Sequence, residues 1–275
     1  MKLDAHQHFW KYSAQEYGWI TDEMAALKHD FLPGDLAPLL AANGFDGCIA
    51  VQAVQAEAET TWLLDLADQN DFIRGVVGWV NLCAPDNDAK WDHIAGRNKL
   101  VGVRHILQGE PDDRFMLRAD FRRGIAQLAE RGLAYDLLLH PRHLPVAVRL
   151  VRDFPGQHFV LDHIAKPPIA EGKLSPWEYD LRELAHCENV HCKVSGMVTE
   201  ANWTQWRAED FKRYLDVVFD AFGADRLMIG SDWPVCTLAA DYAVTMGIVI
   251  DYIRQMNPEM REAVLGANCA RFYRV

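Results

Sequence analysis

Short apolar runs alternate with longer amphipathic runs along most of the chain. Each short run is rich in Val, Ile or Leu and has the length of a buried parallel strand. Strands are predicted at residues 3–8, 46–52, 73–80, 100–105, 133–140, 158–163, 190–195 and 226–232. The alternation indicates that helices connect consecutive parallel strands.

The longer runs have the spacing of helices that bury one face. In residues 116–132, Phe121, Ile125 and Leu128 fall on one side of a helix, and Gly132 is placed to end it. Helices are likewise predicted at 32–44, 56–70, 141–156, 175–189 and 210–226, and two more close the chain at 242–257 and 258–275.

Eight strands alternating with helices over 275 residues are typical of a (β/α)₈ TIM barrel. We therefore expect residues 1–275 to form a single barrel domain of the α/β class. The rival is an open doubly wound sheet, but no Gly-x-Gly-x-x-Gly follows the first strand, so the usual dinucleotide-binding signal is missing. Residues 11–30 are predicted to form a loop over the barrel rim.

Composition and charge narrow the class of protein further. Half of the residues are hydrophobic, which is enough for a large core, and the net charge of −11 argues against a nucleic-acid or anionic-membrane partner. No apolar run reaches the ~18 residues of a membrane-spanning helix. The first residues lack the apolar core of a signal peptide, and the six cysteines show no Cys-x-x-Cys spacing. We therefore expect a reduced, cytoplasmic protein, either a monomer or a homo-oligomer.

Polar residues collect at the carboxyl ends of the predicted strands. Because these ends meet at the rim where (β/α)₈ barrels carry their active sites, we expect the side chains to surround one site. They are His6 and His8, Gln52, Arg104 and His105, His140, Asp162 and His163, Lys193 and Ser195, and Asp232. Each also has an ordinary interpretation, such as a turn cap, a hydrogen bond to a loop carbonyl or a surface ion pair.

Two of these residues, His6 and His8, are separated by one position. In an extended segment both imidazoles point to the same side, where they can share a metal ion or polarise one oxygen. The other histidines are interpreted as structural: His29, His93, His143, His158, His186 and His191. Neither a Gly-x-Ser-x-Gly elbow nor a Gly-x-x-x-x-Gly-Lys-Ser/Thr loop is present.

This pattern of strand-end residues resembles the amidohydrolase superfamily over the whole chain. His-x-His closes the first strand, a His ends the fifth and sixth strands, and an Asp ends the eighth. The segments DAHQHFW, GVRHILQ, DHIAKP and IGSDWPV are more narrowly similar to its sugar-lactonase branch, metal-dependent hydrolases that open L-fuconolactone and L-rhamnonolactone. The resemblance implies a lactonase of carbohydrate catabolism whose partner is a small sugar lactone, with L-fuconolactone as first candidate.

The resemblance also implies roles for individual residues. His6 and His8 match paired metal ligands, and Asp232 matches the carboxylate that contacts the metal and takes a proton from the attacking water. His140 matches a further ligand, and His163 a ligand or a contact to the substrate carbonyl. The fifth strand has no Lys to be carbamylated between two metals, so one divalent ion, Zn²⁺ first, is expected. Some lactonases of the superfamily work without metal, so its necessity stays open.

We expect water to attack the ring ester, with Asp232 as general base and the histidines, alone or with Zn²⁺, meeting the charge on the carbonyl oxygen. The expected catalytic residues are Asp232, His140 and His163. The expected substrate contacts are Arg104, Gln52, Lys166, Trp10 and Trp233. Core packing is the alternative for both tryptophans.

Three other functions fit the same residues. The first is metal-dependent decarboxylation, in which Arg104 would hold the carboxylate of the substrate. The second is hydrolysis of a lactone from aromatic degradation. The third is an inactive barrel that serves as a binding scaffold, although a retained Asp232 disfavours it.

Overall fold

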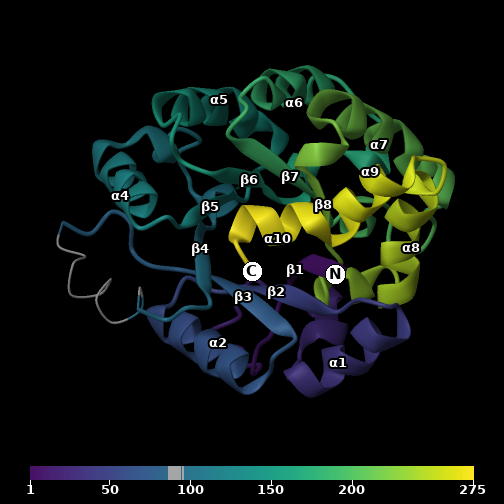
Figure 1. Ribbon diagram of the computed structural model, residues 1–275, viewed down its shortest axis with the longest axis horizontal. Coiled ribbons are helices and arrows are strands. Elements are labelled where there is room, and N and C mark those ends of the chain that lie inside the picture. Colours follow the sequence, from purple (N-terminus) through teal and green to yellow (C-terminus); the bar gives the residue numbers. More distant parts are fainter. Residues whose placement is uncertain (86–93, 95) are drawn as a thin grey trace.

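The computed structural model describes residues 1–85, 94 and 96–275, and its centre is a sheet of eight parallel strands (Figure 1). The strands are β1 Leu3–Gln7, β2 Gly47–Val51, β3 Ile73–Gly78, β4 Leu100–His105, β5 Ala134–Leu137, β6 Phe159–Leu161, β7 Val190–Val194 and β8 Leu227–Ile229. Each strand pairs in parallel with the next one along the chain. The eight predicted strands are confirmed.

The first and last strands meet just beyond β8. The backbone N–H of His8 donates to the carbonyl of Trp233 at 2.7 Å, and the N–H of Asp232 donates to the carbonyl of His6 at 2.8 Å. These bonds nearly close the sheet into the predicted (β/α)₈ barrel, and the open-sheet alternative is excluded. The same bonds fix Asp232 beside the two histidines.

Helices surround the barrel (Figure 1). They are α1 Pro33–Ala42, α2 Glu57–Gln69, α4 Ala119–Glu130, α5 Leu144–Asp153, α6 Trp177–Ala185, α7 Ala208–Phe222, α8 Tyr242–Ile253, α9 Pro258–Glu262 and α10 Asn268–Tyr273. In α4 the predicted face of Phe121, Ile125 and Leu128 is buried. The chain leaves this helix at Gly132, whose φ of +66° suits a glycine.

The last predicted helix, 258–275, is broken in the middle. A π-helical turn at Ala263–Ala267 separates α9 from α10 and lies against the start of β1. A Cβ on Gly266 would overlap the carbonyl oxygen of Met1, so this approach requires glycine. The break allows α10 to lie across the end of the barrel (Figure 1).

The end that α10 covers is the one where the strands begin. Phe272 packs against His158 and His191, whose rings lie at the beginnings of β6 and β7 with centroid distances of 6.0 and 4.7 Å. Apolar side chains such as Val77 and Met228 fill the adjoining part of the barrel. Apolar packing thus closes the amino end, and the polar site is left to the carboxyl end.

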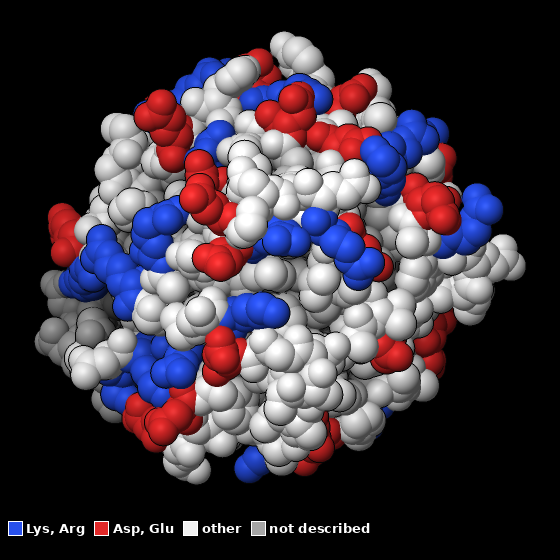
Figure 2. All heavy atoms as spheres, turned by 45° about the vertical axis from the view of Figure 1, so that its right-hand side comes forward, with Lys and Arg blue, Asp and Glu red and all other residues white. Residues whose placement is uncertain are grey.

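The outside of the barrel carries charges of both signs. On the face shown in Figure 2, Lys and Arg side chains lie beside Asp and Glu side chains. Exposed pairs such as Arg182–Asp220 and Lys212–Asp216 contribute about 0–1 kcal/mol each. No helix in the described ranges is long and apolar enough to cross a membrane, and all six cysteines are free.

Candidate active site

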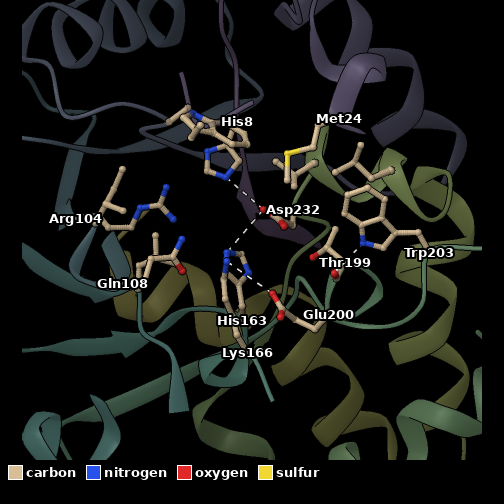
Figure 3. Close-up of a pocket in the computed structure, with 16 residues that line it drawn as sticks. His8, Met24, Arg104, Gln108, His163, Lys166, Thr199, Glu200, Trp203 and Asp232 are labelled. Carbon is tan, nitrogen blue, oxygen red and sulfur yellow. Dashed lines mark hydrogen bonds and ion pairs between the residues drawn. The ribbon is translucent and has the colours of Figure 1, made fainter. Parts of the chain in front are cut away.

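A cavity of about 340 Å³ opens among the loops that follow the strands (Figure 3). Its polar wall consists of His8, Arg104, Gln108, His163, Lys166, Thr199, Glu200 and Asp232, and its apolar wall of Trp19, Met24, Ala53, Ile106, Leu138, Trp203, Val235 and Leu238. Trp19 and Met24 belong to residues 11–30, so this segment lies over the rim as predicted. The size and mixed lining are typical of a small-molecule site.

Asp232 lies at the centre of the polar wall (Figure 3). Its Oδ1 is 3.3 Å from Nε2 of His8, 3.8 Å from Nε2 of His163 and 3.9 Å from Nε2 of His6. Burial raises the pKa of this carboxyl, but His163, His8 and Lys166 outweigh burial and hold the pKa below its ordinary value. Asp232 is therefore an ionised carboxylate among three imidazoles. We call His8, His163 and Asp232 the pocket-facing group.

The two histidines at the end of β1 present the same ring nitrogen to Asp232. Nδ1 of His8 donates to the carbonyl of Val51 at 2.7 Å, which leaves Nε2 as an acceptor. Nδ1 of His6 lies 3.2 Å from Oδ1 of Asp162 and 3.3 Å from Nζ of Lys193. Its Nε2 accepts from Nη1 of Arg104 at 3.2 Å, a contact that a metal ion on Nε2 would replace. Burial lowers the pKa of His6 well below its ordinary value although Asp162 opposes this, and the ring is neutral. Neutral imidazoles held in this way are suited to bind a metal.

Two groups in the described part of the chain have the geometry to hold a metal ion: His6, His8 and Asp232, and His6, Asp162 and His163. In the second group, Asp162 already contacts two cations, at 3.0 Å from Nη1 of Arg104 and 3.2 Å from Nζ of Lys193. The carboxylate of the first group, Asp232, contacts imidazoles instead. Two imidazoles and a carboxylate are a donor set of catalytic zinc sites, which keep one position open. The first group therefore fits a metal better.

His163 is held by a left-handed backbone. The four residues from His163 to Lys166 have φ between 48° and 60°, a region that costs roughly 1–2 kcal/mol for each non-glycine residue. Nδ1 of His163 is hydrogen-bonded to the hydroxyl of Ser195 at 2.9 Å. Gly196 packs on the ring so closely that a Cβ there would lie 2.5 Å from Nδ1. The turn directs His163 and Lys166 into the cavity, and strain of this kind is typical of functional sites.

Beneath the pocket lies an ion-pair cluster that is closed to solvent. Nζ of Lys193, on β7, is 2.5 Å from Oδ2 of Asp136 and 3.2 Å from Oδ1 of Asp162, and all three side chains are fully buried. The hydroxyl of Tyr273, on α10, donates to Asp136 at 2.9 Å. Burial lowers the pKa of Lys193, but the two carboxylates outweigh it, so the amine stays protonated. We call Asp136, Asp162, Lys193 and Tyr273 the enclosed cluster.

Arg104 lies between these two sets of residues. Its Nε and Nη2 donate to Oε1 of Gln52 at 2.9 and 2.7 Å, and Nη2 also donates to the carbonyl of Gln52. Its Nη1 donates to Oδ2 of Asp162 at 3.0 Å and lies 3.2 Å from Nε2 of His6. A guanidinium has five N–H groups, so these five contacts engage all of them.

Comparison with known proteins identifies the family. The amidohydrolase family model matches residues 3–275. The chain belongs to the amidohydrolase family. It is 42% identical to a protein named L-fucono-1,5-lactonase from Burkholderia multivorans, over 99% of this chain and 96% of that protein. A protein of the same name from Burkholderia ambifaria is 38% identical, over 100% and 96%.

A crystal structure shows how closely a relative shares the fold. It is an amidohydrolase from Burkholderia multivorans with bound zinc. It is 42% identical to this chain, covers 100% of it and 99% of its own chain, and superposes with a TM-score of 0.96. The whole barrel is therefore that of an amidohydrolase.

The structure brings most of the predicted residues of this amidohydrolase together. His6, His8 and Asp232 form the candidate metal site. His163, Lys166 and Arg104 lie in the pocket wall with His8 and Asp232. These residues come from four different strand ends, as the barrel rim requires.

His140 is the predicted ligand that the structure does not bring to this site. The sequence predicted that its strand runs to residue 140, but β5 ends at Leu137, and Leu138 lines the pocket instead. His140 begins the following turn, where its N–H donates to Nδ1 of His143 at 3.1 Å. Neither candidate metal group includes it. His93, interpreted as structural, lies outside the described residues.

Trp10, Trp233 and Gln52 lie behind the pocket wall rather than in it. Both tryptophan rings pack on Phe31 with centroid distances of 5.2 Å, and Trp10 also donates its Nε1 to the carbonyl of His29. Both tryptophans are therefore packed in the core, which is the alternative that the sequence left open for them. The side chain of Gln52 is engaged by Arg104, so Gln52 positions that residue.

Sequence reasoning missed Asp136, Tyr273, Glu200 and Trp203, and gave Lys193 no role. A carboxylate within the apolar strand AYDLLLH was a usable signal for Asp136, since a buried charge needs a partner. Glu200 and Trp203 carry no such signal, because they lie in a short 3₁₀ turn and in the loop after it, beyond β7.

Proposed function

We propose that this amidohydrolase hydrolyses the ester bond of an uncharged sugar lactone, with L-fucono-1,5-lactone as first candidate. The observation that carries the proposal is the ionised carboxylate of Asp232, set among His6, His8 and His163 in a cavity of small-molecule size. Two relatives named L-fucono-1,5-lactonase, 42% and 38% identical over nearly the whole chain, support the same reaction. The product would be the aldonic acid.

Asp232 acts as the general base. A water molecule between its carboxylate and the lactone carbonyl gives a proton to Asp232 while the water oxygen bonds to the carbonyl carbon. Asp232 then returns that proton to the ring oxygen as the carbon–oxygen bond breaks. The hydroxyl of the water ends on the acid, and its proton ends on the released alcohol.

His163 is placed to stabilise the carbonyl oxygen as it becomes negative. Burial lowers its pKa well below the ordinary value, so the ring is neutral. When the Ser195 hydroxyl donates to Nδ1, Nε2 carries the hydrogen and donates into the cavity. His6, His8 and Asp232 would hold a divalent metal, Zn²⁺ first, and such an ion would supply Lewis-acid polarisation of the carbonyl.

A serine nucleophile has no support in the geometry. Ser195, the serine that contacts His163, is 2% exposed and lies outside the pocket wall. Direct attack by water therefore suits the site better than an acyl-enzyme.

The geometry disfavours decarboxylation, the nearest rival. A decarboxylase needs a cation to bind the carboxylate of its substrate, and the sequence predicted Arg104 for this role. Four N–H groups of Arg104 donate to oxygens of Gln52 and Asp162, and the fifth points to Nε2 of His6, so at most that one could turn to a carboxylate. A neutral substrate avoids this conflict.

The test is proton release, followed with a pH indicator in weak buffer. The substrates are L-fucono-, L-rhamnono-, D-arabinono- and L-galactono-lactone, each corrected for spontaneous opening. We expect release well above background for at least one lactone, and a rate at least about 100-fold lower for Asp232→Asn.

The other outcomes separate the alternatives. No release from any lactone contradicts the proposal, and release of CO₂ from an aromatic acid favours the decarboxylase. An Asp232→Asn variant with unchanged properties throughout favours the inactive scaffold.

A further inference from the structure

A second set of polar side chains lies in the pocket wall beside Asp232. Gln108 follows β4, Lys166 ends the left-handed turn after β6, and Glu200 ends a short 3₁₀ turn after β7. All three line the cavity, and Figure 3 shows Gln108 and Glu200 on either side of Lys166. We call Gln108, Lys166 and Glu200 the hydroxyl wall, because their hydrogen-bonding groups match those of hydroxyls.

Each member of the hydroxyl wall has hydrogen-bonding capacity that the described residues leave unused. The Oε1 atom of Gln108 is buried and has no hydrogen-bond partner among them. Nζ of Lys166 lies 3.8 Å from Oε1 of Glu200, which is an ion pair but too long for a hydrogen bond. Buried polar atoms are rarely left unpaired, so the wall is arranged for a polar ligand.

The types of these groups indicate what the ligand presents. The carboxylate of Glu200 and the oxygen of Gln108 only accept hydrogen bonds, whereas Lys166 only donates them. Burial and the nearby Asp232 raise the pKa of Glu200, and Lys166 opposes this by favouring the carboxylate. A hydroxyl group does both, so neighbouring hydroxyls on a ring match the wall. A carboxylate only accepts, and it would also meet the negative charge of Glu200 at close range.

No other side chain in the described wall offsets this repulsion. The five N–H groups of Arg104 are engaged by Gln52, Asp162 and His6. Lys166 is already paired with Glu200. A carboxylate on the substrate would therefore find only Lys166, already paired with Glu200, as a cation within reach, and it would face the negative charges of Glu200 and Asp232.

Building on the proposed function, we infer that Glu200, together with Lys166 and Gln108, determines specificity by binding hydroxyl groups of the lactone and rejecting lactones that carry a carboxylate. Glu200 and Lys166 act in opposite senses on a carboxylated substrate. Glu200 repels it and Lys166 attracts it. Substitutions of Glu200 and Lys166 should therefore shift the preference between the two lactones in opposite directions, which loss of a merely structural contact would not do.

The experiment compares two lactones of the same ring, one an aldonolactone and the other an aldarolactone with a terminal carboxylate. For the wild type we expect kcat/KM to favour the aldonolactone by at least about 100-fold. In Glu200→Gln, kcat/KM for the aldonolactone falls about 10- to 100-fold, mainly through KM, because a charged acceptor is lost. For the aldarolactone it rises about tenfold, because the repulsion is removed.

A second variant and a control make the result decisive. In Lys166→Met, kcat/KM falls for both lactones, and it falls more for the aldarolactone. The preference for the aldonolactone therefore widens, whereas in Glu200→Gln it narrows. Glu171→Gln removes an acid from an exposed Lys–Glu pair outside the pocket, Lys173–Glu171, and leaves both values within about twofold. Thermal unfolding of each variant shows that it is folded.

Two results would overturn the inference. If Glu200→Gln or Lys166→Met changes kcat/KM for both lactones by the same factor, or changes neither value, the hydroxyl wall does not select hydroxyl over carboxylate. If the wild type opens neither lactone, the proposed function fails and the inference fails with it. Because the wild-type rate is measured first, the two failures are distinguishable.

Discussion

The pocket-facing group and the enclosed cluster are built from similar residues in different surroundings. Each has a carboxylate at the end of a strand, Asp232 after β8 and Asp162 after β6, and His6 lies 3.9 Å from the first and 3.2 Å from the second. Asp162 is 0% exposed and contacts the cations of Arg104 and Lys193. Asp232 is 4% exposed, faces the cavity and contacts imidazoles.

The difference shows how neighbours assign a role to a carboxylate. Lys193, His6 and Arg104 outweigh the burial that would raise the pKa of Asp162, so this pKa lies well below its ordinary value and the group stays ionised. Its Oδ2 lies 3.0 Å from Arg104 and its Oδ1 lies 3.2 Å from Lys193, so two cations neutralise the group, although Oδ1 makes no hydrogen bond to the described residues. Asp232 is also ionised, but its neighbours are imidazoles that bind or release a proton or a metal. Chemistry is therefore expected at Asp232 and stability at Asp162.

The largest expected effect separates the two sets of residues through activity. Asp232→Asn lowers kcat/KM on the best lactone at least about 100-fold, because the general base is lost. Its free energy of unfolding changes by less than about 1 kcal/mol, since the amide has the same shape. Lactone hydrolysis and urea unfolding measure the two quantities. A variant that keeps a tenth of the wild-type activity would remove Asp232 from the mechanism.

The opposite result is expected in the enclosed cluster. Lys193→Met lowers the free energy of unfolding by about 3–5 kcal/mol, because Asp136 and Asp162 lose the ammonium that compensates their burial. The control Lys212→Met breaks an exposed pair with Asp216 and costs less than about 0.5 kcal/mol. Urea unfolding measures the free energy of unfolding of both variants. Equal losses in the two variants would show that the enclosed cluster does not stabilise the barrel.

A pair of glycines tests how tightly the pocket-facing group is held. Gly196 and Gly223 have φ of +65° and +68°, so alanine strains both by roughly 1–2 kcal/mol. Only at Gly196 would the new Cβ meet the His163 ring, whereas nothing lies within 4 Å at Gly223. We expect Gly196→Ala to lower kcat/KM about 100-fold and Gly223→Ala to leave it unchanged. If both variants keep full activity, the position of His163 is not critical.

The smallest effect concerns the contact from α10. Tyr273→Phe removes the hydroxyl that donates to Asp136 and is expected to cost about 1.5 kcal/mol of unfolding free energy. Because Lys193 still pairs with Asp136, we expect kcat/KM to stay within about twofold of the wild-type value. A large loss of activity with unchanged stability would mean that α10 acts on the pocket through this cluster.

The sequence alone was sufficient for the barrel and for the residues that end its strands. Each buried strand is a short apolar run, so its end could be located to within about three residues and His6, His8, His163 and Asp232 placed on one rim. The predicted ends of β5 and β8 both lie three residues beyond the observed ends, Leu137 and Ile229. Asp232 stays at the site because its N–H donates to the carbonyl of His6, whereas His140 begins a turn toward His143, and no local pattern separates the two cases.

Other parts of the site depend on long-range packing that no local pattern encodes. Trp10 is two residues from His8, yet it packs into the core on Phe31, whereas Trp19, in the loop of residues 11–30, reaches the pocket. Tyr273 contacts Asp136 across 137 positions of sequence. Such contacts are fixed by the folded chain as a whole.

The most direct test of the difference between the two sets of residues is to locate zinc in crystals grown with the ion, using anomalous scattering at its absorption edge. The two candidate metal groups share His6, so one peak position decides between them. We expect a single peak in contact with His6, His8 and Asp232. A peak between His6, Asp162 and His163, peaks at both places, or no peak at either would contradict the assignment of metal chemistry to Asp232 and of structural pairing to Asp162.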